Sequence, residues 1–297
     1  MLMRVGAFDF NDPLPELREP QAFAMLSPWV DVGRLGSSTL SQLEAHFHAR
    51  DLGGLRRPGA FYDFTRYRPT LYIVDGRREI KTPNTFVKYA RRETGNDLVF
   101  LHCLEPHMLG ETFVESILKV LEKLGVRRYF VVGGMYDSVP HTRPLLVSGS
   151  ATGSNMESEL ANLKVRQSGY EGPTSINFLV SQKAANRGIE TVTLLVHLPH
   201  YAQLEEDYSG QHVLLNLLCS LCNFSVDLSG IKQRGEEQYR EVGLVVEESP
   251  QAKQMVEAMQ MSYDAALEEQ SGYEQAPHLS LEVEKFLQEI DKGFGSN

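Results

Sequence analysis

The stretch RRYFVVGGMYDSVPHTRP, residues 127–144, carries most of the information about the fold. Its first part is rich in β-branched and aromatic side chains, which is typical of a strand. Gly133 and Gly134 follow, where the backbone can turn tightly because no Cβ is present. The rest is a polar segment stiffened by Pro140 and Pro144. We therefore expect a strand that ends at these glycines and leads into a polar loop.

On both sides of this stretch, strand patterns and helix patterns alternate along the chain. Such alternation predicts parallel strand pairing through right-handed crossovers. We therefore expect an α/β protein with a mostly parallel central sheet flanked by helices. Strands are expected at 22–30, 68–74, 97–102, 127–132, 145–148 and 191–197, and helices at 34–50, 111–124, 175–187 and 213–222, with a further one opening at 154.

The character of the sequence changes after Phe224, where strand signals give way to helical ones. Residues 226–297 hold 15 acidic and 6 basic side chains, whereas residues 1–225 hold 24 and 23. We therefore expect a core domain at 1–225 and an acidic helical C-terminal subdomain at 226–297, with its last helix near Leu281. The acidic surface is either a solvated helical face or a docking surface for a basic partner.

The composition argues for a soluble, cytoplasmic protein. The apolar share of 42% is enough for a full core, and no apolar run approaches the roughly 20 residues that a membrane span needs. The first residues carry acidic side chains and prolines where a signal peptide would have an apolar core. The net charge of −10, with no basic stripe, argues against nucleic acid. We expect neither membrane nor nucleic-acid binding.

The polar loop after residue 132 is the strongest candidate site, because ligands of α/β sheets usually sit at the carboxyl ends of strands. Asp137 could orient His141 or pair with it, and Arg143 could hold an anion with its planar guanidinium group. Alternatively, Asp137 and Arg143 pair with each other and only hold the shape of the loop. The candidate binding residues here are Gly133, Gly134, Tyr136, Asp137, His141 and Arg143.

Three other segments could reach the same rim of the sheet. Trp29 and Asp31 follow the first of the long strands, where Asp31 could instead cap the next helix and Trp29 could anchor the turn. Glu105 follows another strand end. The glycine-rich segment 148–154 leads from a strand into a helix and could hold phosphate, or it could be a plain tight turn. Its candidate residues are Gly149, Gly153 and Ser154.

Patterns typical of metal or cofactor sites are incomplete in this sequence. His197 and His200 are separated by Pro199, which breaks the helix that would align two ligands. Cys219 and Cys222 lie in a leucine-rich segment, so we expect buried thiols rather than a redox pair. We predict no metal and no cofactor.

Patterns typical of catalysis are incomplete as well. The sequence lacks the G-x-S-x-G elbow of serine hydrolases, and Ser138 lies too near its histidine in sequence for a triad, whose members come from separate segments. We assign no catalytic residue. If the protein is an enzyme, His141 would act as acid or base and Arg143 as an anion clamp, and the candidates are Asp137, His141, Arg143 and Glu105.

Several segments resemble the proteasome assembly chaperone 2 family in the family's order. They are PWVDVG (28–33), FYDF (61–64), RP (68–69), LEP (104–106), GGMYDSVPHTRP (133–144) and GPTS (172–175), of which 133–144 is the most specific. The resemblance implies a nucleoside-phosphorylase-like α/β fold with a helical C-terminal part. It also implies a homo-oligomer, often trimeric among bacterial relatives.

Eukaryotic and some archaeal relatives assist proteasome assembly by binding α-subunits, so the resemblance implies a protein partner. Those archaeal relatives use a C-terminal tail of a hydrophobic residue, Tyr and any residue, whereas this sequence ends in FGSN, residues 294–297. We therefore favour a non-catalytic scaffold or assembly chaperone of unknown partner. The alternative is an enzyme or binding protein for a small anionic or nucleoside-like ligand at the strand-end rim. A third possibility gives the loop a purely oligomeric role.

Overall fold

A computed structural model describes residues 1–168 and 170–274 of the chain. Its centre is a ten-stranded sheet in the order β1-β2-β4-β7-β8-β3-β9-β12-β10-β11. The strands of this sheet are β1 (Leu2–Val5), β2 (Phe8–Asn11), β3 (Gln21–Ser27), β4 (Arg50–Leu55), β7 (Phe86–Ala90), β8 (Leu98–Leu104), β9 (Arg128–Asp137), β10 (Val147–Ala151), β11 (Arg166–Gln167) and β12 (Glu190–Pro199).

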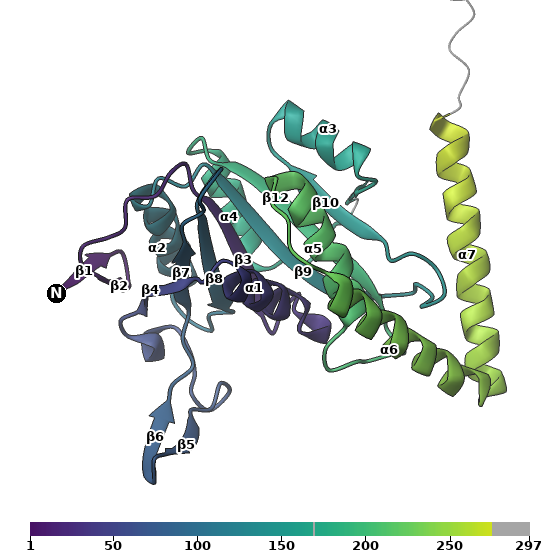
Figure 1. Cartoon of the computed structure of the whole chain (residues 1–297), viewed down its shortest axis with the longest axis horizontal. Coiled ribbons are helices and arrows are strands. Elements are labelled where there is room, and N and C mark those ends of the chain that lie inside the picture. Colours follow the sequence, from purple (N-terminus) through teal and green to yellow (C-terminus); the bar gives the residue numbers. More distant parts are fainter. Residues whose placement is uncertain (169, 275–297) are drawn as a thin grey trace, which may run out of the picture.

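Helices cover both faces of the sheet (Figure 1). One buried cluster joins the sheet to α2 and α4, and a second joins the opposite face to α1, α3 and α5. The α/β class with a helix-flanked central sheet is therefore confirmed. The helices are α1 (Leu35–His46), α2 (Gly110–Lys123), α3 (Ser154–Asn162), α4 (Ile176–Ala185), α5 (Tyr208–Cys222), α6 (Ser229–Glu247) and α7 (Pro250–Glu274), with short turns η1 (Val32–Arg34) and η2 (Pro58–Ala60).

The prediction of a mostly parallel sheet is wrong, because the sheet is mixed. The four central strands β8, β3, β9 and β12 run parallel, whereas β1, β2, β4 and β7 pair antiparallel on one side and β10 pairs antiparallel with β12 on the other. The four strands at the N-terminal edge were missed in the sequence because they are only four to six residues long, and the RDLGGL of β4 also lacks an apolar alternation.

The strand expected at 68–74 forms, but it lies outside the main sheet. Strands β5 (Thr70–Val74) and β6 (Arg77–Lys81) pair only with each other and project from the body as a hairpin (Figure 1). Every residue of both strands is exposed.

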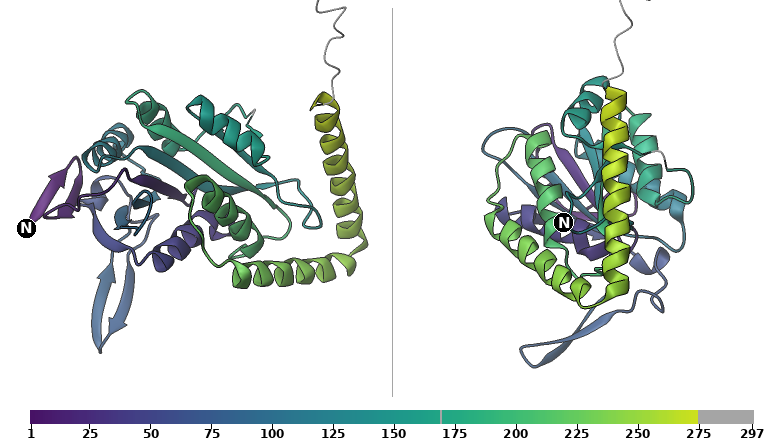
Figure 2. Two further views of the ribbon diagram at one scale, coloured as in Figure 1. Left: turned by 45° about the horizontal axis from the view of Figure 1, so that its top comes forward. Right: turned by 90° about the vertical axis from the view of Figure 1, so that its right-hand side faces the viewer.

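Beyond the core, α6 and α7 form a helical arm. Helix α6 packs against α5, where Gly235 lies against Ser209 and the Tyr239 hydroxyl donates to Asp207 over 2.9 Å. Helix α7 then turns and stands along the side of the molecule (Figure 2). The helix expected near Leu281 lies outside the described residues.

The segment 133–144 is called the signature loop below. The strand before it does not end at Val132, as the sequence suggested, but continues as β9 to Asp137. Its two glycines serve close packing rather than turning. A Cβ on Gly133 would overlap the carbonyl oxygen of Val30, and a Cβ on Gly134 would lie 2.7 Å from a methyl group of Leu35. The amide of Gly134 also donates to the Val30 carbonyl over 2.8 Å. The turn after β3 therefore lies directly on the backbone of β9.

This contact predicts that Gly133→Ala lowers the free energy of unfolding by about 1–3 kcal/mol, the usual cost of overpacking a close contact. The matched control is Gly230→Ala in α6, where no neighbouring atom lies within 4 Å of the added Cβ. Urea denaturation of both variants measures the difference. Equal stability of Gly133→Ala and the parent protein would contradict the proposed packing role.

Candidate functional site

The carboxyl ends of the central strands meet at one edge of the sheet, as the strand-end rule requires. Residues 29–31 follow β3, Glu105 follows β8, and Asp137 ends β9. The segments are tied together through their backbones: Asp31 bridges to Gly134, and the Glu105 amide donates to Ser27 over 2.9 Å. The structure thus places the sequence-predicted Trp29, Asp31, Glu105 and Asp137 at this edge.

Asp31 has a structural task at this edge. One of its carboxylate oxygens accepts a hydrogen bond of 3.0 Å from the Ser37 amide in the first turn of α1. Burial raises the pKa of Asp31, and the hydrogen bonds from the helix start oppose that rise. The capping role considered from the sequence is therefore present, while Trp29 beside it stays about half exposed.

His141 fastens the signature loop to the segments that follow β12. The Tyr201 hydroxyl lies 2.6 Å from the His141 Nδ1 and also accepts the His141 amide over 2.8 Å. The His141 ring further meets the Tyr239 ring of α6 edge to face. Because burial disfavours the charged ring, the pKa of His141 is lowered.

Arg143 fastens the same loop to α7. Its guanidinium group binds the Asp264 carboxylate with two hydrogen bonds, of 2.8 Å from Nε and 2.7 Å from Nη2. Beside this pair, the Tyr263 hydroxyl donates to the Pro144 carbonyl over 2.8 Å. The Arg143 guanidinium group, which could have bound an anionic ligand, is therefore paired with a carboxylate of the same chain.

Asp137 pairs with neither His141 nor Arg143, the two partners considered from the sequence. Its Oδ2 lies 2.7 Å from the His197 Nδ1, and the His197 Nε2 lies 2.8 Å from the Ser148 Oγ. The three residues come from the adjacent strands β9, β12 and β10. Sequence reasoning missed His197 because it was tested only as a metal ligand, and missed Ser148 because no elbow motif marks it.

Apart from Ser148, the segment 148–154 leads away from the signature loop. Strand β10 runs antiparallel to β12 and carries its end to the opposite edge, where the Thr152 amide donates to Thr191 over 2.9 Å. Gly153 adopts a positive φ of 100° directly before Ser154 opens α3. Gly149 lies inside β10, where a Cβ would overlap the Thr193 carbonyl oxygen. Gly153 and Ser154 therefore lie apart from the other candidates.

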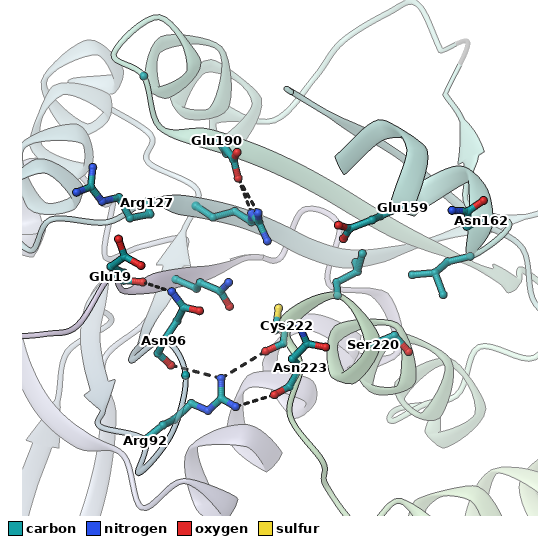
Figure 3. A pocket seen from close by; sticks show the side chains of 16 residues that line it. Glu19, Arg92, Asn96, Arg127, Glu159, Asn162, Glu190, Ser220, Cys222 and Asn223 are labelled. Atoms are coloured by element: carbon teal, nitrogen blue, oxygen red, sulfur yellow. Dashed lines mark hydrogen bonds and ion pairs between the residues drawn. The ribbon is translucent and has the colours of Figure 1, made fainter. Parts of the chain in front are cut away.

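That opposite edge also carries a hollow of about 960 Å³ (Figure 3). Two of its arginines hold elements together: Arg92 donates to the carbonyls of Cys222 and Asn223 at the end of α5, and Arg128 pairs with Glu190 over 2.7 Å. None of the sequence-predicted site residues lines it. Arg92, Arg128 and Glu190 in its walls therefore have structural roles in helix capping and strand pairing.

Residues 1–168 and 170–274 contain no group of three or more His, Cys, Asp or Glu side chains that could hold a metal ion. Within the same residues, no helix combines the length and apolar character that crossing a bilayer requires. In the C-x-x-C segment, burial raises the pKa of the Cys222 thiol and, less deeply buried, that of Cys219.

The fold and this edge define a three-layer α/β protein with a projecting hairpin and a helical arm fastened to its strand-end loop. The chain belongs to the PAC2 family, whose family model matches residues 25–246. The family resemblance of the sequence motifs is thereby confirmed.

Solved structures with this fold include proteins from Streptomyces avermitilis and Mycobacterium tuberculosis. A PAC2 family protein from Streptomyces avermitilis is 26% identical, with a TM-score of 0.72 over 80% of this chain and 99% of that one. A Mycobacterium tuberculosis proteasome-assembly chaperone homologue is also 26% identical, with a TM-score of 0.71 over 79% and 99%. A second M. tuberculosis protein, of unknown function, is 22% identical, with a TM-score of 0.79 over 92% and 93%. No curated protein matches the chain.

The half-buried Glu105 carboxyl gives this edge a pH dependence. Burial raises the pKa of Glu105, although its carboxylate accepts the Ile176 amide. The folded state therefore binds this proton more tightly than the unfolded state, and the stability contributed by Glu105 decreases as the pH rises above the unfolded value of about 4.3.

We predict that Glu105→Gln loses less stability than the parent protein between pH 4 and pH 7. Urea denaturation at the two pH values measures this difference, and Glu93→Gln, a change at an exposed loop carboxylate, serves as the control. An identical pH dependence in Glu105→Gln and the parent protein would show that the Glu105 carboxyl is not destabilised by burial.

Proposed function

We propose that this chain is a protein-binding scaffold of the assembly-chaperone type, which holds its partner on the arm formed by α6 and α7. Membership of the PAC2 family supports this function, as does the likeness to the M. tuberculosis proteasome-assembly chaperone homologue. The arm itself defines the chemistry of the partner.

The observation that carries the proposal is the apolar surface of the arm. Met261 on α7 is 75% exposed, and Leu244 and Val245 on α6 are both largely exposed. Leu244 and Val245 are neighbours in α6, and exposed large apolar side chains of this kind mark interaction sites. Around them, residues 229–274 carry 10 acidic and 4 basic side chains, a net charge of −6. The partner expected for this surface presents apolar side chains within a basic rim.

The cellular location, the core fold, the domain division and the oligomeric state expected from the sequence belong to the same proposal. We place the protein in the cytoplasm, give residues 1–225 a nucleoside-phosphorylase-like core, and treat residues 226–297 as a separate helical unit that binds the partner. We also propose a homo-oligomer, and a trimer as its form, as the family resemblance implies.

The hairpin β5–β6 supports self-association. The strand register places Leu71, Ile73 and Ile80 on one of its faces, and all three side chains are exposed. A two-stranded hairpin that stands alone in water is marginally stable. The hairpin and the arm project from different parts of the molecule (Figure 1). A contact between the hairpin of one copy and another surface of the next is head-to-tail, and it closes as a ring when the rotation between copies allows closure.

The partner proposal predicts that Met261→Lys weakens capture of the partner from an extract of the native host by at least tenfold. A cation in the apolar centre of an interface is desolvated without compensation. Thr70→Lys on the hairpin is the control, and quantitative mass spectrometry of cross-linked complexes provides the measurement. If every preparation returned only the protein itself, a partner-binding scaffold would be excluded.

The oligomer proposal predicts that Ile73→Lys combined with Ile80→Lys reduces the mass measured by light scattering to that of one protomer. Thr70→Lys again serves as the control, because its side chain lies on the other face of β5. An unchanged mass in the double variant would assign self-association to another surface.

A further inference from the structure

The hydrogen-bonded chain Asp137–His197–Ser148 is the most chemically specific arrangement outside the loop contacts. Its two links measure 2.7 Å and 2.8 Å, and each residue is held on a strand of the main sheet. These three residues are also accessible to solvent, since the Asp137 side chain is 42% exposed, the His197 side chain is 16% exposed, and Ser148 is half-buried.

The partners fix the direction of the hydrogen bonds. An ionised carboxylate only accepts, so the His197 Nδ1 carries its proton toward Asp137. The His197 Nε2 is then the acceptor of the neutral ring, and the Ser148 hydroxyl donates to it. A hydroxyl that donates to an imidazole oriented by a carboxylate is the arrangement that activates serine as a nucleophile.

We propose that Ser148 is a nucleophile for small carboxylic esters, with His197 as general base and Asp137 as the positioning residue. The Ser148 Oγ forms a bond to the acyl carbon while its proton passes to the His197 Nε2. The bond between the acyl carbon and the leaving oxygen breaks, and that oxygen takes the proton from Nε2. Water then attacks the acyl-serine by the same route, which releases the carboxylic acid and restores the hydroxyl.

The neighbouring strand suggests the charge of the ester. Arg166 of β11 is the register partner of Ser148 in a parallel pair, so the two side chains lie on the same face of the sheet. The Arg166 Nη2 is buried and has no hydrogen-bond partner among the described residues. A guanidinium group in this place favours an acyl group that carries its own carboxylate, and it stabilises the negative charge that develops on the acyl oxygen.

This activity is independent of partner binding, because the three residues lie on the sheet and none of them belongs to the arm or the hairpin. If the hydrogen bonds among Asp137, His197 and Ser148 only held the three strands together, mutation would lower the thermal stability and no covalent chemistry would occur. The two roles therefore differ in what an electrophile does to the intact protein.

The test exposes the full-length protein to a fluorophosphonate probe and locates the adduct by peptide mass spectrometry. We expect one adduct per chain, on Ser148. We expect Ser148→Ala to abolish it and His197→Gln and Asp137→Asn to slow it at least tenfold, with thermal melts that show folded protein. Ser150→Ala is the matched control, because Ser150 is an exposed serine on the same strand and should leave the labelling unchanged.

A second measurement needs no variant of the nucleophile. The parent protein should release p-nitrophenolate faster from mono-p-nitrophenyl succinate than from p-nitrophenyl acetate, and Arg166→Gln should remove that preference. The absence of an adduct on Ser148 in the folded parent protein, or labelling of Ser150 at an equal rate, would overturn the proposal. Neither result would bear on partner binding by the arm.

Discussion

The close contact between the turn after β3 and the backbone of β9 is the constraint on which the functional edge depends. A side chain at Gly133 would overlap the Val30 carbonyl, which instead accepts the Gly134 amide. The contact fixes where α1 begins, since Asp31 bridges to β9 and accepts the Ser37 amide of that helix. One backbone contact thus sets the strand-end edge and the helix that covers it.

With that edge fixed, the polar residues of the signature loop are used to attach the C-terminal helices. His141 meets Tyr201 and the α6 ring of Tyr239, while Arg143 holds Asp264 of α7. Ion pairs this exposed contribute little stability by themselves. Their value lies in geometry, because a planar guanidinium group on a carboxylate sets the direction of a helix that has few other contacts with the core. The loop therefore orients the arm formed by α6 and α7.

The sequence predicts the central parallel strands well because their apolar runs are long and each is buried on both faces, as in β3 and β8. It misses β4 and β7, whose stability comes from pairing with neighbours rather than from their own pattern. It also finds Asp137 but not its partners. His197 and Ser148 reach Asp137 only through the order of β9, β12 and β10, and strand order is a property of tertiary structure that no local motif records.

The hairpin, the arm and the hydrogen-bonded chain differ in what holds them in place. All strand residues of the hairpin are exposed, and a pair of strands gains too little from its own contacts to be rigid. The arm likewise exposes large apolar side chains, among them Leu244, Val245 and Met261. Asp137, His197 and Ser148, by contrast, lie on strands fixed by pairing on both sides. The exposed apolar surfaces thus project from the fold, whereas the hydrogen-bonded residues lie within the sheet, so the two proposed roles rest on separate parts of the molecule.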